Sequence, residues 1–448
     1  MLHRPKKALL RLLTQPLAVL RPEAGLMILC GLALAGCGKQ ETPGVTTIRW
    51  VVDPNPIRQE QIAGFEKTNP GIKVNLDPDS GNQKVLTQLA GGINPDLFAI
   101  YDPASIRVFA KKDVLEDLAP WMKKCGVSLS DFWPGLSSYI QQEGIVCGLP
   151  DNCGPFVVFY NRRLLREAGL QTPKAGWTWD QFLDYARILT RKDARGRTTQ
   201  FGAGYIEPWI IFWQYGAQMY SADGKRCTVD SPEAKKAARF WVSLRLTERV
   251  TPSQSEEQSM ASLGGWGGAG NLFKAERLGM YIAGRWMSIE YRKNKKLDWD
   301  VLPVPQLPGG IKTTLLASKV YAIPKGCKNK EAAFKFLKYL VSKEDELIVS
   351  STGDGIPSVM KYGKAREFLF NPAYPNERNN QVWLDEMRNA RSPELSQYVS
   401  NLDSQTIFNE EMDIMWQRRQ SSDQACDNIA KRINSLIRRN IANPNLMD

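Results

Sequence analysis

Histidine is almost absent from this 448-residue sequence: its one histidine is His3, close to the amino terminus. If the first residues are removed during export, the mature chain has none. That excludes Ser–His–Asp and Cys–His catalysis, zinc chemistry of the HExxH type and any histidine-ligated metal. The sequence also lacks a Cys-x-x-Cys pair and a Gly-x-x-x-x-Gly-Lys-Ser/Thr phosphate loop. A large part of enzyme chemistry is thereby excluded before any motif is considered.

Residues 1–36 are predicted to be a lipoprotein signal peptide rather than part of the fold. A basic segment reaches Arg21, and an apolar run of about 13 residues follows, which is too short to span a bilayer as a permanent helix. The run ends in Leu-Ala-Gly-Cys at residues 34–37, which resembles the bacterial lipobox. We therefore predict lipidation of Cys37, with a short anchor or a plain secretory signal as the alternative.

The rest of the chain is predicted to be soluble and exported. No apolar run after Cys37 reaches the length of a transmembrane helix, and residues 37–45 are a polar tether. The formal charge of +12 includes +4 from residues 1–36, and the remaining +8 is modest for this length. The basic run 191–197 lacks interleaved aromatic residues, so we expect a solvated loop and no nucleic-acid partner. The predicted location is the periplasm or the cell surface, with the lipid as the only membrane anchor.

Six cysteines follow the tether, and an even number in an oxidising compartment makes disulfides plausible. They are Cys125, Cys147, Cys153, Cys227, Cys327 and Cys426. Their spacing does not decide the pairing, which stays open.

Strand and helix patterns alternate over the first hundred mature residues. We predict strands at 47–52, 72–76 and 97–101, with helices at 57–65 and 85–89 between them. This order is typical of βαβ units and a mainly parallel sheet, hence an α/β fold class. In such sheets ligands bind beyond the carboxyl ends of the strands. The candidate ligand residues there are Asp53, Asn55, Asn82, Tyr101 and Asp102.

The later part of the chain is rich in helix patterns. Thr178 and Gln181 form a capping box ahead of one apolar stripe. A second helix is predicted at 331–341, and a final amphipathic stripe contains Cys426, Ile429, Ile433, Leu436 and Ile437.

Several segments in a fixed order resemble one family. They are 90–101, 113–118, 148–150 with 156–161, 178–182, 209–216, 223–224, 230–232, 272–286, 322–324, 355–357 and 425–436. Together they resemble the family 1 extracellular solute-binding proteins of ABC importers, the maltose-binding and glycerol-phosphate-binding group. In the segment 272–286, Glu276 and Arg277 stand where that family usually has a Gly-Lys turn.

The resemblance implies a periplasmic-binding-protein-like fold, in which two α/β lobes joined by hinge strands close over a ligand cleft. We place lobe 1 at 46–152 plus 305–354 and lobe 2 at 153–304 plus 355–448. The chain is expected to cross between lobes near 152–157, near 303–308 and near 353–357.

Sugar sites need aromatic rings for the faces of the pyranose and planar polar groups for its hydroxyls. The further candidate ligand residues are Asp151, Trp209, Trp266, Arg285, Trp286 and Asp354, whereas Trp177 and Trp179 are predicted to be structural. If Arg285 faced the cleft, an acidic sugar would bind better than its neutral analogue. The Gly-x-Gly-x-x-Gly at 265–270 follows a polar segment and not a hydrophobic strand, so a nucleotide site is not expected.

The sequence thus predicts a lipid-anchored, monomeric sugar-binding subunit of an ABC importer, with a carbohydrate ligand and the permease as partners. No catalytic residue, metal or cofactor is expected. One alternative is a lipid-anchored glycosidase with paired carboxylates. Another keeps the fold but binds a polyamine, ferric ion or phosphodiester.

Overall fold

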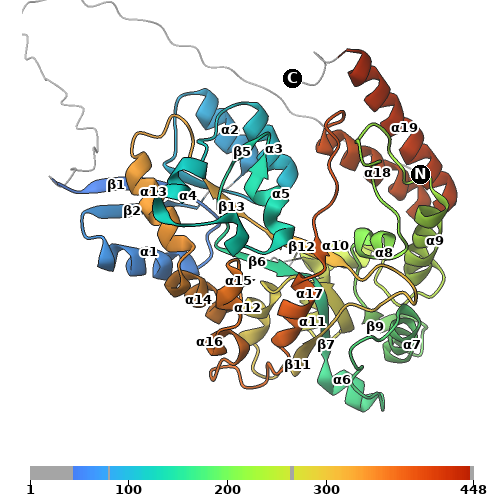
Figure 1. The fold of residues 1–448 in the computed structure, drawn as a ribbon. Helices are drawn as coiled ribbons and strands as arrows, with labels where there is room; N and C mark the ends of the chain where they lie inside the picture. Colours follow the sequence, from blue (N-terminus) through green and yellow to red (C-terminus); the bar gives the residue numbers. More distant parts are fainter. Residues whose placement is uncertain (1–43, 79–80, 263–266, 444–448) are drawn as a thin grey trace, which may run out of the picture. The chain divides into compact units, whose positions relative to one another are not determined.

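Three sheets of four or five strands organise the chain from Gly44 onward. The structure, a computed structural model, describes residues 44–78, 81–262 and 267–443 (Figure 1). The first sheet has the order β13-β3-β1-β2. Its strands are β1 (Thr46–Val51), β2 (Ile72–Asp77), β3 (Leu97–Ile100) and β13 (Val320–Ala322). β1 pairs in parallel with β2 and β3, which confirms the three predicted strands, and β13 adds an antiparallel edge.

The helices between these strands also lie where the sequence predicts them. α1 (Ile57–Thr68) follows β1 after the Asp-Pro-Asn-Pro break, and α2 (Asn82–Ala90) follows β2. Trp50 of β1 is fully buried between Tyr321 and Phe336, both of which meet it edge-on. This packing fixes the carboxyl end of β1 and therefore the position of the residues after it.

The second sheet is mixed and has the order β11-β7-β10-β9-β8. Its strands are β7 (Val157–Asn161), β8 (Arg191–Lys192), β9 (Thr198–Ala203), β10 (Leu278–Ala283) and β11 (Trp299–Leu302). β10 pairs antiparallel with β7 and parallel with β9. A second apolar core packs on this sheet and includes Trp179, Phe212 and Ile429.

The third sheet, β14-β6-β12-β15, connects the other two, and we call it the linking sheet. Its strands are β6 (Asn152–Pro155), β12 (Thr314–Ser318), β14 (Ile356–Pro357) and β15 (Ala390–Arg391). One residue separates β6 from β7 and one separates β12 from β13, so each strand runs directly into a different large sheet. Figure 1 shows β6 and β12 between the two larger sheets. β6 and β14 lie in predicted crossing segments, but β12 comes after the predicted segment 303–308.

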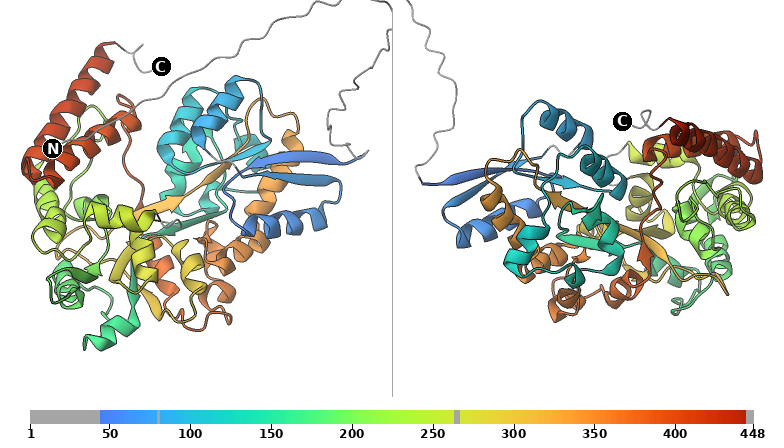
Figure 2. Two further views of the ribbon diagram at one scale, coloured as in Figure 1. Left: turned by 180° about the vertical axis from the view of Figure 1, so that it is seen from behind. Right: turned by 45° about the horizontal axis from the view of Figure 1, so that its top comes forward.

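The helices pack around all three sheets. Near the first are α3 (Pro103–Lys111), α4 (Ala119–Cys125), α5 (Ser137–Ile140), α13 (Lys330–Leu340) and α14 (Lys343–Thr352). The others are α6 (Arg162–Glu167), α7 (Trp179–Leu189), α8 (Pro208–Gln214), α9 (Pro232–Leu246), α10 (Gln254–Ala261), α11 (Gly268–Lys274), α12 (Met287–Arg292), α15 (Met360–Gly363), α16 (Arg366–Leu369), α17 (Gln381–Met387), α18 (Asn401–Trp416) and α19 (Ser422–Ala442). Figure 2 shows α18 and α19 packed side by side, and α9 lies against α19.

Local predictions for the helices are confirmed. Thr178 and Gln181 form the capping box of α7, and Trp177 and Trp179 are buried there, as expected of structural residues. In α19 the predicted stripe is buried except for Leu436, which is half-buried. The polar segment before the Gly-x-Gly-x-x-Gly run is the helix α10, whereas a nucleotide fingerprint follows a strand.

The six cysteines after the tether all carry free thiols in the part of the chain that the structure describes. Five of them are buried, and only Cys125 is half-buried. Within that same part, no helix combines the length and apolar character needed to cross a bilayer.

Candidate functional site

Side chains that follow β1 and β3 lie together at the carboxyl edge of the first sheet. The Tyr101 hydroxyl donates a hydrogen bond to Asp53 Oδ1 at 2.7 Å and accepts one from the Asp53 N–H at 3.1 Å. The Asn55 N–H donates to Asp53 Oδ2 at 3.2 Å. Tyr101 is 36% exposed, so its ring is accessible to a ligand.

Asn82 and Asp102 form a second small cluster through Ser105. Asp102 caps α3 by accepting hydrogen bonds from the Ser105 N–H at 2.7 Å and from its hydroxyl at 2.6 Å. The Asn82 amide donates to the same hydroxyl at 2.9 Å. The carboxylate of Asp102 is thus committed to the helix start, whereas Asn82 Oδ1 is buried without a hydrogen-bond partner among the described residues.

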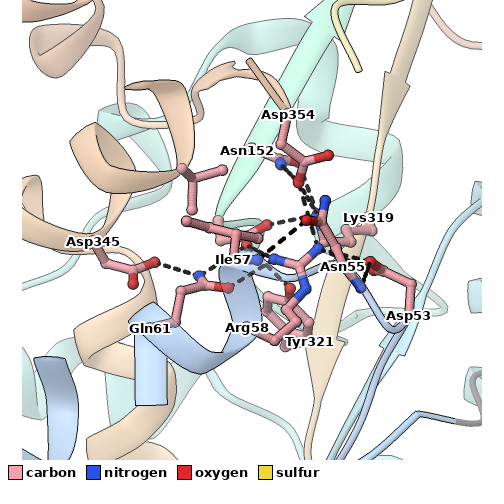
Figure 3. A network of polar contacts seen from close by, with 12 residues as sticks. Asp53, Asn55, Ile57, Arg58, Gln61, Asn152, Lys319, Tyr321, Asp345 and Asp354 are labelled. Carbon is pink, nitrogen blue, oxygen red and sulfur yellow. Dashed lines mark hydrogen bonds and ion pairs between the residues drawn. The ribbon is translucent and has the colours of Figure 1, made fainter. Parts of the chain in front are cut away.

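Asp151 and Asp354 lie in a buried ionic network that the sequence did not reveal. Figure 3 shows Asp354 with Arg58 and Lys319. Arg58, 1% exposed at its side chain, reaches Asp53 at 3.0 Å, Asp354 at 3.4 Å and Asp151 at 3.6 Å. Lys319 provides a second cation, 3.2 Å from Asp151 and 3.6 Å from Asp354. We call these five residues the hinge network, because Asp151 precedes β6, Lys319 follows β12 and Asp354 precedes β14.

Two carboxyl groups in and beside the hinge network have pKa values that are shifted in opposite directions. Burial alone would raise the pKa of Asp53, but Arg58, Lys319 and the Tyr101 hydroxyl lower it to about 2. Gln61 extends the network by donating to Asp345 Oδ2 at 2.7 Å. Burial, with the nearby Asp151, raises the pKa of Asp345 well above its usual range. The cations therefore hold Asp53 ionised, while Asp345 favours its neutral form.

The expectation that Arg285 lines an open cleft is wrong. Its side chain is buried, its Nη1 donates to the backbone carbonyls of Ser350 at 2.8 Å and Gly355 at 2.5 Å, and its guanidinium lies over Phe368. Burial, together with Arg292, lowers its pKa to about 9. Arg285 thus joins α14 to the segment before β14, and the preference for acidic sugars that depended on it loses its basis.

Two of the three tryptophans that were predicted to bind ligand are half-buried against other aromatic rings. Trp286 is half-buried and meets Phe156, the residue between β6 and β7, edge-on at 5.5 Å. Trp209 on α8 is also half-buried and packs on neighbouring rings, including Phe408 of α18. Trp266 and the predicted lipidation site Cys37 lie outside the described residues.

A pocket of about 320 Å³ opens beside the linking sheet, on the second large sheet. Its apolar and aromatic lining includes Phe156, Tyr205, Ala261, Ala269, Tyr281 and Ile282. Its polar lining is Glu207, Glu257 and Gln258, with the backbone of Gly267 and Gly268. Rings with a few polar groups in a cavity of this size are typical of a small-molecule site. None of these lining residues was predicted from the sequence to bind ligand.

The two glutamates of the pocket are held differently. Glu207 precedes α8 without capping it, and its carboxylate has no hydrogen bond or ion pair with a described residue, so burial raises its pKa to about 7. Glu257 Oε2 accepts from Arg245 Nη2 at 3.0 Å, while its Oε1 is buried without a hydrogen-bond partner among the described residues. Burial also raises the pKa of Glu257. Both glutamates therefore have carboxyl oxygens free to bind a ligand.

Gly268 sets the position of Glu257. A Cβ at residue 268 would lie 2.0 Å from the Glu257 carbonyl oxygen, so α11 can approach α10 this closely only with glycine there. The close contact fixes α10 against α11 and aims Glu257 at the pocket. The arrangement can bind a ligand through rings and carboxylates. In the described ranges no group of three or more potential metal ligands occurs.

Comparison with known proteins assigns residues 52–346 to the family described as bacterial extracellular solute-binding protein. A Brucella abortus protein described as a binding protein is 27% identical over 339 residues, covering 72% of this chain and 76% of its own. The maltooligosaccharide ABC transporter solute-binding lipoprotein of Streptococcus pneumoniae is 31% identical over 233 residues, covering 48% and 50%. The solved ABC substrate-binding protein of Listeria monocytogenes in complex with cycloalternan has a TM-score of 0.73 at 23% identity, covering 87% of this chain and 98% of that one. These likenesses confirm the predicted resemblance and the two-lobed α/β fold.

Proposed function

We propose that this chain, which belongs to the bacterial extracellular solute-binding protein family, captures a sugar or oligosaccharide for an ABC importer. The pocket of Tyr205, Tyr281 and Glu207 beside β6 carries the proposal, because rings and carboxylates are the groups a pyranose needs. Two relatives support the choice of a sugar. The Streptococcus pneumoniae lipoprotein is named for maltooligosaccharide, and the Listeria monocytogenes protein was solved in complex with cycloalternan.

Capture would proceed by closure of two lobes about the linking sheet. Tyr101, Asp53 and Asn55 offer polar groups from the first large sheet, and the pocket offers its rings from the second. Phe156 of the pocket and Asp151 of the hinge network stand at opposite ends of β6. A ligand that contacts both lobes stabilises the closed form, which the permease would recognise. We propose that the chain acts as a monomer.

We propose binding without catalysis, although Glu207 and Glu257 share one pocket as the carboxylates of a glycosidase would. Glu257 is paired with Arg245, and the family match supports capture and not hydrolysis. Oligosaccharides incubated with the protein should be recovered intact by chromatography. Cleavage products that appear with the wild type and disappear with Glu207→Gln would favour the enzyme.

A binding sugar should make the protein more compact. A calorimetric screen of sugars would first identify a ligand, and small-angle scattering would then measure the radius of gyration with and without it. We expect a smaller radius with the bound sugar, because closure brings the lobes together, and no change with a sugar that does not bind. A tightly bound sugar that leaves the radius unchanged contradicts capture between lobes.

We also propose that Cys37 carries a lipid that anchors the protein at the periplasmic or outer surface. Labelled fatty acid fed to cells should enter the wild type and be lost in Cys37→Ala. Cys30 lies in the same apolar segment and gives a matched control, since Cys30→Ala should remain labelled. Labelling of Cys37→Ala at the wild-type level would end the lipoprotein assignment.

A further inference from the structure

The pocket described above is lined by two glutamates, and the nearby cation Arg245 pairs with only one of them. Among the described residues that line it there is no lysine, arginine or histidine. Arg245 of α9 lies behind the lining, is 9% exposed at its side chain, and is paired with Glu257 Oε2. That arginine is fixed by Trp416 at 4.9 Å and Tyr205 at 5.6 Å. Its charge is therefore used within the protein and not offered to a ligand.

The carboxylate of Glu207 has no hydrogen-bond donor or cation paired with it among the described residues. Its neighbours across the pocket are uncharged rings or the already paired Glu257, and the hydroxyls of Tyr205 and Tyr281 stay protonated because burial raises the pKa of each. Glu256 on α10 adds a further negative charge near Glu257. A cation that entered the pocket would meet Glu207 and the unpartnered Oε1 of Glu257, while Arg245 stays paired with Oε2 of Glu257.

We propose that this pocket takes a sugar-like solute that carries a protonated amine, which Glu207 and Glu257 bind together. The rings of Tyr205, Tyr281 and Phe156 contact the apolar faces of the solute, and their electron-rich faces favour a nearby cation. An amine provides the positive charge that the half-buried carboxylate of Glu207 lacks, whereas a carboxylate on the solute is repelled. This specificity rests on the proposed sugar-binding function and is the reverse of a preference for acidic sugars.

Protons compete with the amine for Glu207. Since the pKa of Glu207 is about 7 in the empty pocket, the carboxyl is mostly neutral at pH 5.5 and mostly ionised at pH 8. Binding of an amine should therefore strengthen as pH rises through 7. At pH 6 the same binding should release about one proton per site from Glu207, because the ionised form pairs with the amine.

Three maltose derivatives that differ only at the terminal C6 test the proposal by calorimetry: an amine, the natural hydroxyl and a carboxylate. At pH 8 we expect the amine to bind about ten-fold more tightly than maltose, a ratio that corresponds to the free energy of one hydrogen bond to a charged group. The carboxylate should bind more weakly than either. In Glu207→Gln the amine should bind no more tightly than maltose, at pH 8 and at pH 6 alike. Glu233→Gln removes the same charge from the exposed first turn of α9 and should leave the preference unchanged.

The outcomes separate this proposal from the sugar assignment itself. If maltose binds the wild type as tightly as the amine does, the sugar function stands and the amine site is overturned. The amine site is also overturned if Glu207→Gln retains the preference. If none of the three binds, the proposed function fails for this series of sugars, and the amine site fails with it. Titrations at pH 6 in two buffers of different ionisation enthalpy should show proton release with the amine derivative and none with maltose.

Discussion

Replacing Arg58 with alanine is expected to lower the free energy of unfolding by about 3–5 kcal/mol, the range for removing one partner of a buried ion pair. Asp151 is fully buried, and Arg58 lies 3.6 Å from its Oδ2 and 2.7 Å from Gln61 Oε1. Without the guanidinium, Lys319 still pairs with both Asp151 and Asp354, but one cation then faces two carboxylates. The variant therefore leaves excess negative charge in the interior, and that cost exceeds any loss of packing.

Urea unfolding of the ligand-free protein measures the effect. Arg191→Ala, which removes an exposed arginine from β8, should change stability by less than about 0.5 kcal/mol, as expected of a surface site. A double variant, Arg58→Met with Asp151→Asn, removes a positive and a negative charge and should recover part of the loss. A loss below about 1 kcal/mol in Arg58→Ala, or strict additivity in the double variant, would show that the hinge network contributes little.

The sequence was sufficient for the three parallel strands of the first sheet because their signals are local, whereas the edge strand β13 was not predicted. Strands and helices alternate between Thr46 and Ile100, each bounded by proline, glycine or asparagine, so periodicity alone locates them. The rule that ligands bind beyond strand ends then brought Asp53 and Tyr101 together correctly. Nothing local indicated Arg58, since its partner Asp354 is 296 residues away along the chain.

The role of Arg285 was predicted from its place in the family-like segment 272–286, which is present as the end of α11, β10 and the turn before α12. The use of its charge was not predictable, because the carbonyls of Ser350 and Gly355 that accept its hydrogen bonds come from the distant α14 and the loop after it. The pocket was missed for the same reason. Tyr205 and Glu257 come from different elements, and the close contact at Gly268 that places Glu257 depends on backbone geometry and not on composition.

The buried carboxyl of Glu207 is expected to make stability depend on pH. Burial raises its pKa from 4.5 to about 7, so between these values the unfolded chain releases the proton while the folded protein keeps it. Because the folded state then binds more protons, its stability falls as pH rises. The penalty is absent below pH 4.5 and complete above pH 7. It amounts to at most about 3 kcal/mol, since solvent that enters the pocket reduces it.

Glu207→Gln removes this penalty and keeps the size of the side chain. The variant and the wild type should have nearly equal free energies of unfolding at pH 4.5, and the variant should be more stable by up to about 3 kcal/mol at pH 8. Urea unfolding at a series of pH values gives the free energy of unfolding of each protein as a function of pH. Burial also raises the pKa of Glu386 to about 7, but both proteins contain that group, so its effect cancels in the difference. Glu233→Gln should show no such rise with pH.

A constant difference between Glu207→Gln and the wild type from pH 4.5 to 8 would mean that Glu207 ionises normally. A difference that grows through pH 7 would show that the empty pocket retains a destabilising carboxyl, as expected if that carboxyl serves a ligand.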